Sequence, residues 1–195
     1  MLTKTSKEDS LYVAYKTIDE FFDSYSIHNA VRQIQDVIKA ATDNQPYKMG
    51  QAYDVVFLLE NLSALYRAAL VIGNEKEKKV IINARENGYP QMTQLQYYVS
   101  TNHANNQWNC FPRYLTAEQY FNPYKAIQEA FVEIPIDNWD SVLKEIQRYA
   151  LSDEPIDLEQ SSYNVLCIQL GLQLLVEACH LLYVRLRLER KQKEE

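Results

Sequence analysis

Glycine is scarce in this chain, which has four glycines among 195 residues. Proteins made mainly of sheet need many tight turns, and the favoured hairpin turns use glycine where φ is positive. Four scattered glycines also cannot form the glycine-rich loop that binds phosphate groups in many nucleotide-binding proteins. No alternating strand pattern runs for more than a few residues. These absences argue against a sheet protein and against a phosphate-binding loop.

Long basic runs and cysteine motifs are also absent. The formal net charge is −6 at pH 7, and the C-terminal stretch RLRLERKQKEE mixes both signs. Because proteins neutralise nucleic-acid phosphates with a basic face, we do not expect a nucleic-acid partner. Cys110, Cys167 and Cys179 follow no disulfide or metal-binding spacing, so buried thiols in a reducing compartment are expected. We therefore predict a cytoplasmic protein without a cofactor.

The stretch from Tyr163 to Val184 is apolar and, at 22 residues, long enough to cross a bilayer. It also contains five polar or charged residues: Asn164, Gln169, Gln173, Glu177 and His180. A charged residue at the centre of a membrane helix costs about 2–3 kcal/mol. A helix in a protein core accommodates these residues without that cost, so no membrane association is predicted. The first residues, MLTKTSKEDSLYVAYKTIDEFF, contain no uninterrupted apolar segment, and no targeting signal is expected.

Apolar residues recur at helical spacing along most of the chain. The longest periodic segments cover residues 11–25, 27–41, 55–72, 139–150 and 161–187. Six prolines, at positions 46, 90, 112, 123, 135 and 155, mark boundaries between segments. Thr116 and Gln119 have the spacing of a helix capping box, and Pro123 is placed to begin a further helix.

This pattern predicts an all-α fold, a single-domain bundle of six to eight helices over residues 1–195. The third and last helices are expected at its centre, because their apolar residues cover the widest arcs. The last helix, from about residue 160 to at least Arg185, is predicted to be the longest element and largely buried. Residues 188–195 are predicted to form a frayed, charged tail.

Glu177 and His180 form the sharpest chemical motif in the chain. Residues three apart share a helix face, so the two side chains could bind one metal ion. Di-iron and di-manganese four-helix bundles use this Glu-x-x-His spacing, but they need two such motifs and two further glutamates. This chain has one motif. The alternative is that both residues lie on a narrow solvent-exposed stripe, and we predict no metal site.

A second polar seam lies on the third helix and consists of Glu60, Ser63 and Arg67. These residues follow one another along one helix face. If the third and last helices pack together, the seam could meet Gln173, Glu177 and His180 of the last helix in a buried network; the alternative is that the seam is simply exposed to solvent. Such a network would bind a ligand or fix the register of the two helices.

The segment from Tyr97 to Tyr124 is the best candidate for a binding surface, because aromatic, asparagine and arginine residues are concentrated there. Aromatic rings supply contact area at small entropic cost, and asparagine side chains supply adaptable hydrogen bonds. We predict that Tyr98, His103, Trp108 and Arg113 contact the partner. The alternative is a loop whose rings close the end of the bundle.

No arrangement of residues points to catalysis. A Gly-x-Ser-x-Gly nucleophile motif is absent, and His103 with Cys110 is poor support for a Cys–His pair. Fifteen tyrosines suit half-buried grooves and interfaces. The sequence therefore predicts a non-enzymatic protein that binds a partner protein, with a second copy of itself among the candidates. A regulatory, an adaptor and a toxin-neutralising role fit equally. The alternative is a metal- or small-molecule-binding enzyme or carrier that uses Glu177 and His180.

Overall fold

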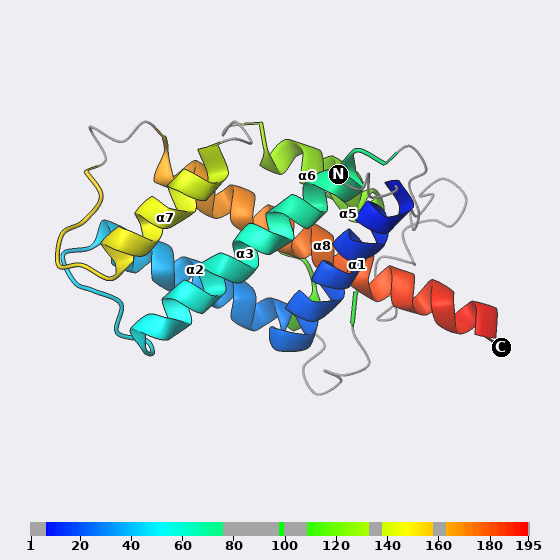
Figure 1. The fold of residues 1–195 in the computed structure, drawn as a ribbon, viewed down its shortest axis with the longest axis horizontal. Helices are drawn as coiled ribbons and strands as arrows, with labels where there is room; N and C mark the ends of the chain where they lie inside the picture. Colours follow the sequence, from blue (N-terminus) through cyan, green and yellow to red (C-terminus); the bar gives the residue numbers. More distant parts are fainter. Residues whose placement is uncertain (1–6, 76–97, 100–108, 133–137, 158–162, 195) are drawn as a thin grey trace, which may run out of the picture.

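A computed structural model describes residues 7–75, 98–99, 109–132, 138–157 and 163–194 of the chain. Seven helices and no strand lie in these residues (Figure 1). This confirms the predicted all-α bundle with a long C-terminal helix. The helices are α1 (Lys7–Ser24), α2 (Ile27–Thr42), α3 (Ala52–Gly73), α5 (Ala117–Phe121), α6 (Pro123–Ala130), α7 (Trp139–Ala150) and α8 (Val165–Glu194).

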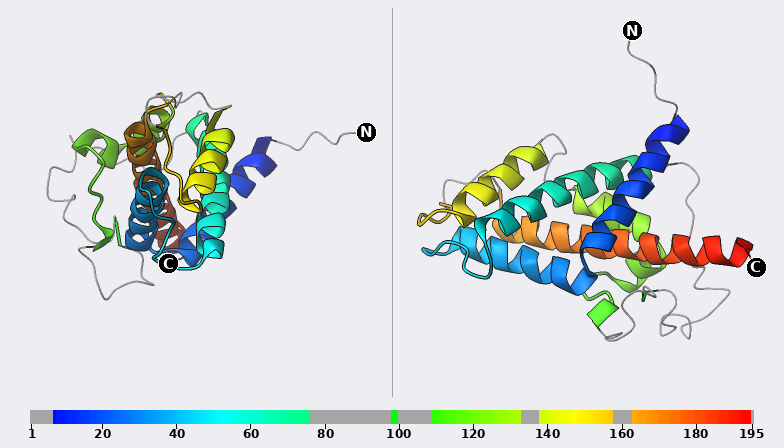
Figure 2. Two further views of the ribbon diagram at one scale, coloured as in Figure 1. Left: turned by 90° about the vertical axis from the view of Figure 1, so that its left-hand side faces the viewer. Right: turned by 60° about the horizontal axis from the view of Figure 1, so that its bottom comes forward.

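The helices pack in two layers, and α8 lies in the middle of one of them (Figure 2). One layer contains α8 with α2 and α6 on either side, and the other contains α1, α3 and α7. The sequence prediction placed the third and last helices together at the centre. Instead, α3 packs mainly on α1 and α7, and only a short part of it contacts α8. The reason is that α3 has a solvent-facing side, on which Tyr53, Glu60 and Arg67 are exposed.

The helix α8 is the central element of the core. Every residue from Leu175 to Arg185 is buried, so this part of the helix is covered on all sides. A helix that is apolar around its whole circumference needs such an environment. The residues predicted to form a frayed tail are helical as far as Glu194. Arg187 and Arg190 lie within ion-pair distance of Asp23 and Asp19 on α1, at 3.2 and 3.4 Å.

Gly171 permits a close approach between α8 and the end of α6. A Cβ atom at this position would lie 3.2 Å from the carbonyl oxygen of Ala130 and 3.5 Å from the ring of Trp139. Trp139 begins α7 and is buried. A glycine inside a helix is normally unfavourable relative to alanine. Here the missing side chain allows α6, α7 and α8 to meet.

Side-chain caps fix several helix starts. The Thr116 hydroxyl accepts a hydrogen bond from the backbone N–H of Gln119, and the Gln119 side chain accepts one from the N–H of Thr116. This reciprocal pair is the capping box that the sequence predicted. Pro123 occupies the first turn of α6, also as predicted. Ser26 caps α2 through the N–H of Asn29.

Among the described residues, α3 and the Val165–Arg190 part of α8 are long and apolar enough to cross a membrane. Half of the most apolar window of α3 and 67% of that of α8 are buried inside the fold. The core helix of a soluble protein has the same length and composition as these helices. The absence of a membrane association therefore stays a prediction.

Gln173 places an amide in the core without a hydrogen-bond partner. It lies on α8 and is 0% exposed. Neither Nε2 nor Oε1 has a partner within the part of the chain that the structure describes. A buried polar group without a hydrogen bond costs about 1–3 kcal/mol. This residue therefore lowers the stability of the fold.

We expect the substitution Gln173→Met to raise the free energy of unfolding by about 1–3 kcal/mol. Methionine has a similar length and removes both unpaired polar atoms. Urea unfolding monitored by circular dichroism measures the change. Gln169→Met, one turn earlier and partly exposed, is the matched control and should change stability by less than about 0.5 kcal/mol. A destabilised Gln173→Met protein would show that the amide is hydrogen-bonded in solution.

Candidate binding site

Glu177 fixes the segment of residues 109–115 (the 109–115 segment) against α8. Its side chain is 2% exposed. Oε1 accepts a hydrogen bond from the backbone N–H of Arg113, and Oε2 accepts one from that of Tyr114, each at 2.7 Å. One buried side chain thus satisfies consecutive backbone donors that would otherwise have no helix or sheet partner.

Burial raises the pKa of the Glu177 carboxyl, because the charged form loses its hydration. The backbone N–H groups of residues 113–115 and the charge of Arg113 act in the opposite direction. The effect of burial is larger, so the pKa lies above the ordinary glutamate value. The position of the segment therefore depends on a carboxyl group whose ionisation is disfavoured by its surroundings.

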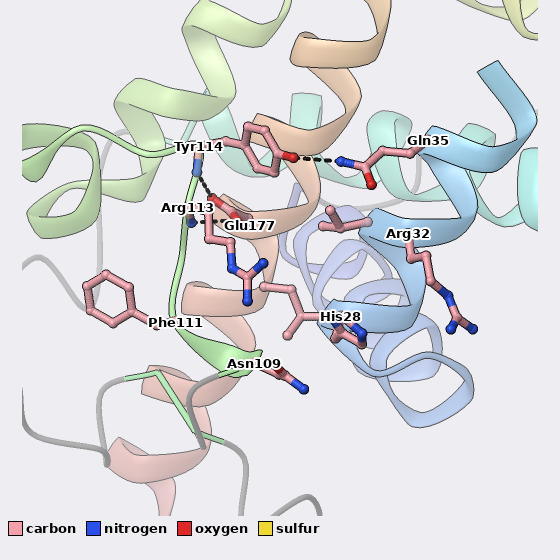
Figure 3. A pocket seen from close by; sticks show the side chains of 10 residues that line it. His28, Arg32, Gln35, Asn109, Phe111, Arg113, Tyr114 and Glu177 are labelled. Carbon is pink, nitrogen blue, oxygen red and sulfur yellow. Dashed lines mark hydrogen bonds between the residues drawn. The ribbon is translucent and has the colours of Figure 1, made fainter. Parts of the chain in front are cut away.

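A second contact joins the 109–115 segment to α2. The Gln35 side chain donates a hydrogen bond from Nε2 to the Tyr114 hydroxyl at 2.7 Å (Figure 3). This bond connects residues 79 positions apart in the chain. The segment is thus held by α8 on one side and by α2 on the other.

A pocket of about 100 Å³ lies between α2 and the 109–115 segment. Figure 3 shows Arg113 projecting between the two, with His28 and Asn109 at the lower edge and Arg32 further out on α2. Glu177 is the acidic member of the lining. The remaining lining residues are Ile27, Val31, Gln35, Phe111 and Tyr114. We call this hollow the arginine pocket.

The two arginines of the pocket differ from the arginines that pair with aspartates elsewhere in the described chain, and they share their lack of an ion pair with the exposed Arg148 of α7. Arg67, Arg187 and Arg190 form ion pairs with aspartates. Arg32 and Arg113 are exposed and form no ion pair with any described residue. Two guanidinium groups and one carboxylate leave the lining with a net positive charge. The pocket is therefore locally cationic within a protein of net charge −6.

The structure separates the residues predicted to contact a partner. Arg113 is exposed and lines the arginine pocket. Tyr98 is 4% exposed, and its ring packs edge-on against Phe111 at 5.2 Å. Tyr98 is therefore a core residue rather than part of the exposed lining. His103 and Trp108 lie outside the described residues.

Sequence reasoning missed the contribution of α2 to the site. His28, Arg32 and Gln35 line the pocket together. They are spaced four and three residues apart and therefore share one face of the helix. The polar face of α2 was the signal that could have identified them. However, spacing within one helix does not show that these residues lie opposite Arg113.

Glu177 and His180, the candidate metal ligands, point to different neighbours. The Glu177 carboxylate binds the 109–115 segment, whereas the His180 ring packs against Phe22 of α1 at 5.1 Å. Both residues are buried, so the expectation of a solvent-exposed stripe is wrong. The described residues contain no group of three or more side chains suited to holding a metal ion.

The polar seam of the third helix meets α7 and not α8. Ser63 donates a hydrogen bond to Asp140 at 2.8 Å, and Arg67 pairs with the same carboxylate. These two contacts hold the pKa of Asp140 below its usual value, and the hydrogen bond from Arg67 has the larger effect. The possible network with the polar residues of α8 is therefore not formed by Ser63 and Arg67, which both bind Asp140. The seam fixes the position of α7 on α3.

Comparisons of the chain with protein-family models, with curated proteins and with solved structures find no match. The candidate site is therefore argued from the geometry and charge of its own residues.

Proposed function

We propose that this protein is a non-enzymatic binding protein that holds a partner protein at the arginine pocket. The observation that carries the proposal is the pair Arg32 and Arg113. Both residues line one hollow, with Arg113 projecting into it and Arg32 at its outer edge on α2 (Figure 3), and neither has an ion-pair partner among the described residues. Arginine and the aromatic residues are enriched at protein interfaces, where they supply most of the binding energy.

The size and lining of the pocket favour binding over catalysis. Small-molecule sites usually occupy about 300–1,000 Å³, whereas the arginine pocket measures about 100 Å³. Its volume suits a single side chain of a partner better than a whole substrate. Among the described residues, the lining contains no serine, cysteine, threonine or lysine, which are common nucleophiles in covalent catalysis. The carboxylate of Glu177 already binds backbone N–H groups.

The fixed backbone of the 109–115 segment also supports this function. Glu177 holds the backbone at residues 113 and 114, and Gln35 holds the Tyr114 side chain. A surface that is already ordered loses little conformational entropy when a partner binds. Arg113 projects from this fixed backbone, which is the arrangement expected of an anchor residue.

The test is affinity capture from the native host with the full chain as bait. We expect the wild type to retain a specific partner. The double variant Arg32→Ala with Arg113→Ala should retain at least about tenfold less of that partner, because charged anchor residues contribute much of the binding energy at such interfaces. Arg148→Ala with Lys144→Ala, which removes two exposed charges from α7, is the matched control and should retain the partner. Sedimentation of the same proteins identifies a second copy of the chain as the partner.

Equal retention by the double variant and the wild type would place binding elsewhere and defeat the proposal. Equal loss in both double variants would show a general effect of charge. Folding does not confound the comparison, because both arginine side chains are exposed and surface substitutions usually change stability by less than about 0.5 kcal/mol.

A further inference from the structure

We infer that the arginine pocket receives the side-chain carboxylate of an aspartate or glutamate from the partner protein. This inference rests on the proposed function and names the chemical group that the site recognises. It follows from the charge, the hydrogen-bonding groups and the size of the pocket.

The lining presents donors to its occupant. Arg32 and Arg113 are exposed and offer guanidinium N–H groups, which are donors only. The Tyr114 hydroxyl accepts its bond from Gln35 and keeps its own proton to donate. The amide of Asn109 lies at the same edge of the pocket as His28 (Figure 3). A group that only accepts hydrogen bonds complements this set, and an ionised carboxylate is such a group.

Glu177 limits the charge that the pocket accepts. Its carboxylate lines the same hollow as the two guanidinium groups and leaves one net positive charge when His28 is neutral. A monoanion neutralises this charge, whereas a phosphate dianion would leave the occupied pocket with one net negative charge. No ion pair joins Arg113 to Glu177, so the arginine keeps its guanidinium for the occupant. The balance favours a carboxylate over a phosphate group.

The volume of the pocket matches the end of an acidic side chain. About 100 Å³ accommodates a carboxylate with one or two methylene groups. Ile27, Val31 and Phe111 supply apolar surface beside the charged groups. Methylene groups of the incoming side chain would contact these residues while the oxygens meet the arginines. This arrangement distinguishes a side chain from a small free anion.

The test is a titration of the isotopically labelled full chain at low salt, followed by amide chemical shifts. The probe is N-acetyl-glutamate N-methylamide, and the neutral control is N-acetyl-glutamine N-methylamide. We expect saturable shifts at residues 28–35 and 109–114, with a dissociation constant on the order of millimolar, as suits so small a ligand. Arg113→Ala should weaken the binding about tenfold, whereas Arg148→Ala should leave it unchanged.

Three outcomes would overturn the inference: no saturable shift, equal binding of the glutamine compound, or tighter binding of inorganic phosphate than of the glutamate compound. None of these outcomes affects the capture experiment. Loss of the partner in the double variant, together with a failed titration, would leave the proposed function standing and the carboxylate rejected. A successful titration without a captured partner would support the carboxylate site and reject the protein-binding function.

Discussion

The substitution Glu177→Ala should lower the free energy of unfolding by about 2–5 kcal/mol. It removes the acceptor for the backbone N–H groups of residues 113 and 114 and leaves a cavity beside α8. Each hydrogen bond to a charged group contributes about 1.5–3 kcal/mol, and the freed donors recover part of this by meeting water. Urea unfolding at pH 7 measures the loss. A change below about 1 kcal/mol would show that the segment does not depend on this carboxylate.

The variant Glu177→Gln separates ionisation from shape in the same experiment. The folded pKa of Glu177 lies above the unfolded value of about 4.5. Between these two values the folded state binds more protons than the unfolded state, so the stability contributed by the carboxyl falls as pH rises. The stability of the wild type relative to Glu177→Gln should therefore decrease as pH rises from 4.5 and become constant above the folded pKa. An increase over this range would contradict the assigned direction.

The substitution Leu175→Ala should cost about 2–5 kcal/mol, the range for truncating a core leucine. Leu175 is 0% exposed and lies in the part of α8 that is covered on all sides. The loss combines transfer of the removed methyl and methylene groups with the cavity that remains. Thermal and urea unfolding of the purified variant measure it.

Leu166→Ala is the matched control on the same helix. Leu166 is 59% exposed, and alanine has a high helix propensity. The control should change stability by less than about 1 kcal/mol. Equal losses in the two variants would mean that α8 is not buried in the way the structure shows.

The fold could be predicted from the sequence because most of its helices carry local signals. The apolar spacing of Ile27 to Ala41 indicated α2, and Thr116 with Gln119 indicated the start of α5. Both helices are present with these starts. Periodicity shows which face of a helix is apolar, but it does not show which helix covers that face. For this reason the partners of α3 were predicted wrongly, although its limits were close.

The candidate site was less predictable, because its contacts join distant parts of the chain through backbone groups. The sequence marks Glu177 as a polar residue in an apolar helix, which points to a side chain or a metal ion as its partner. Its partners are backbone N–H groups 63 and 64 residues earlier, and a backbone donor leaves no mark in the sequence. Arg113 was predicted as a contact residue from local composition. Its neighbours His28 and Arg32 come from a different helix.

The position of α8 in the chain has a consequence for how the protein is made. The helices α1, α2 and α6 all precede α8 in the sequence, and all three pack against it. During synthesis, which proceeds at about 5–20 residues per second, their apolar faces emerge from the ribosome before the helix that covers them. Asp23 can meet Arg187 only after the chain has grown by a further 164 residues. The nascent protein therefore holds uncovered apolar surface until α8 has been translated, and chaperone binding should be strongest just before that point.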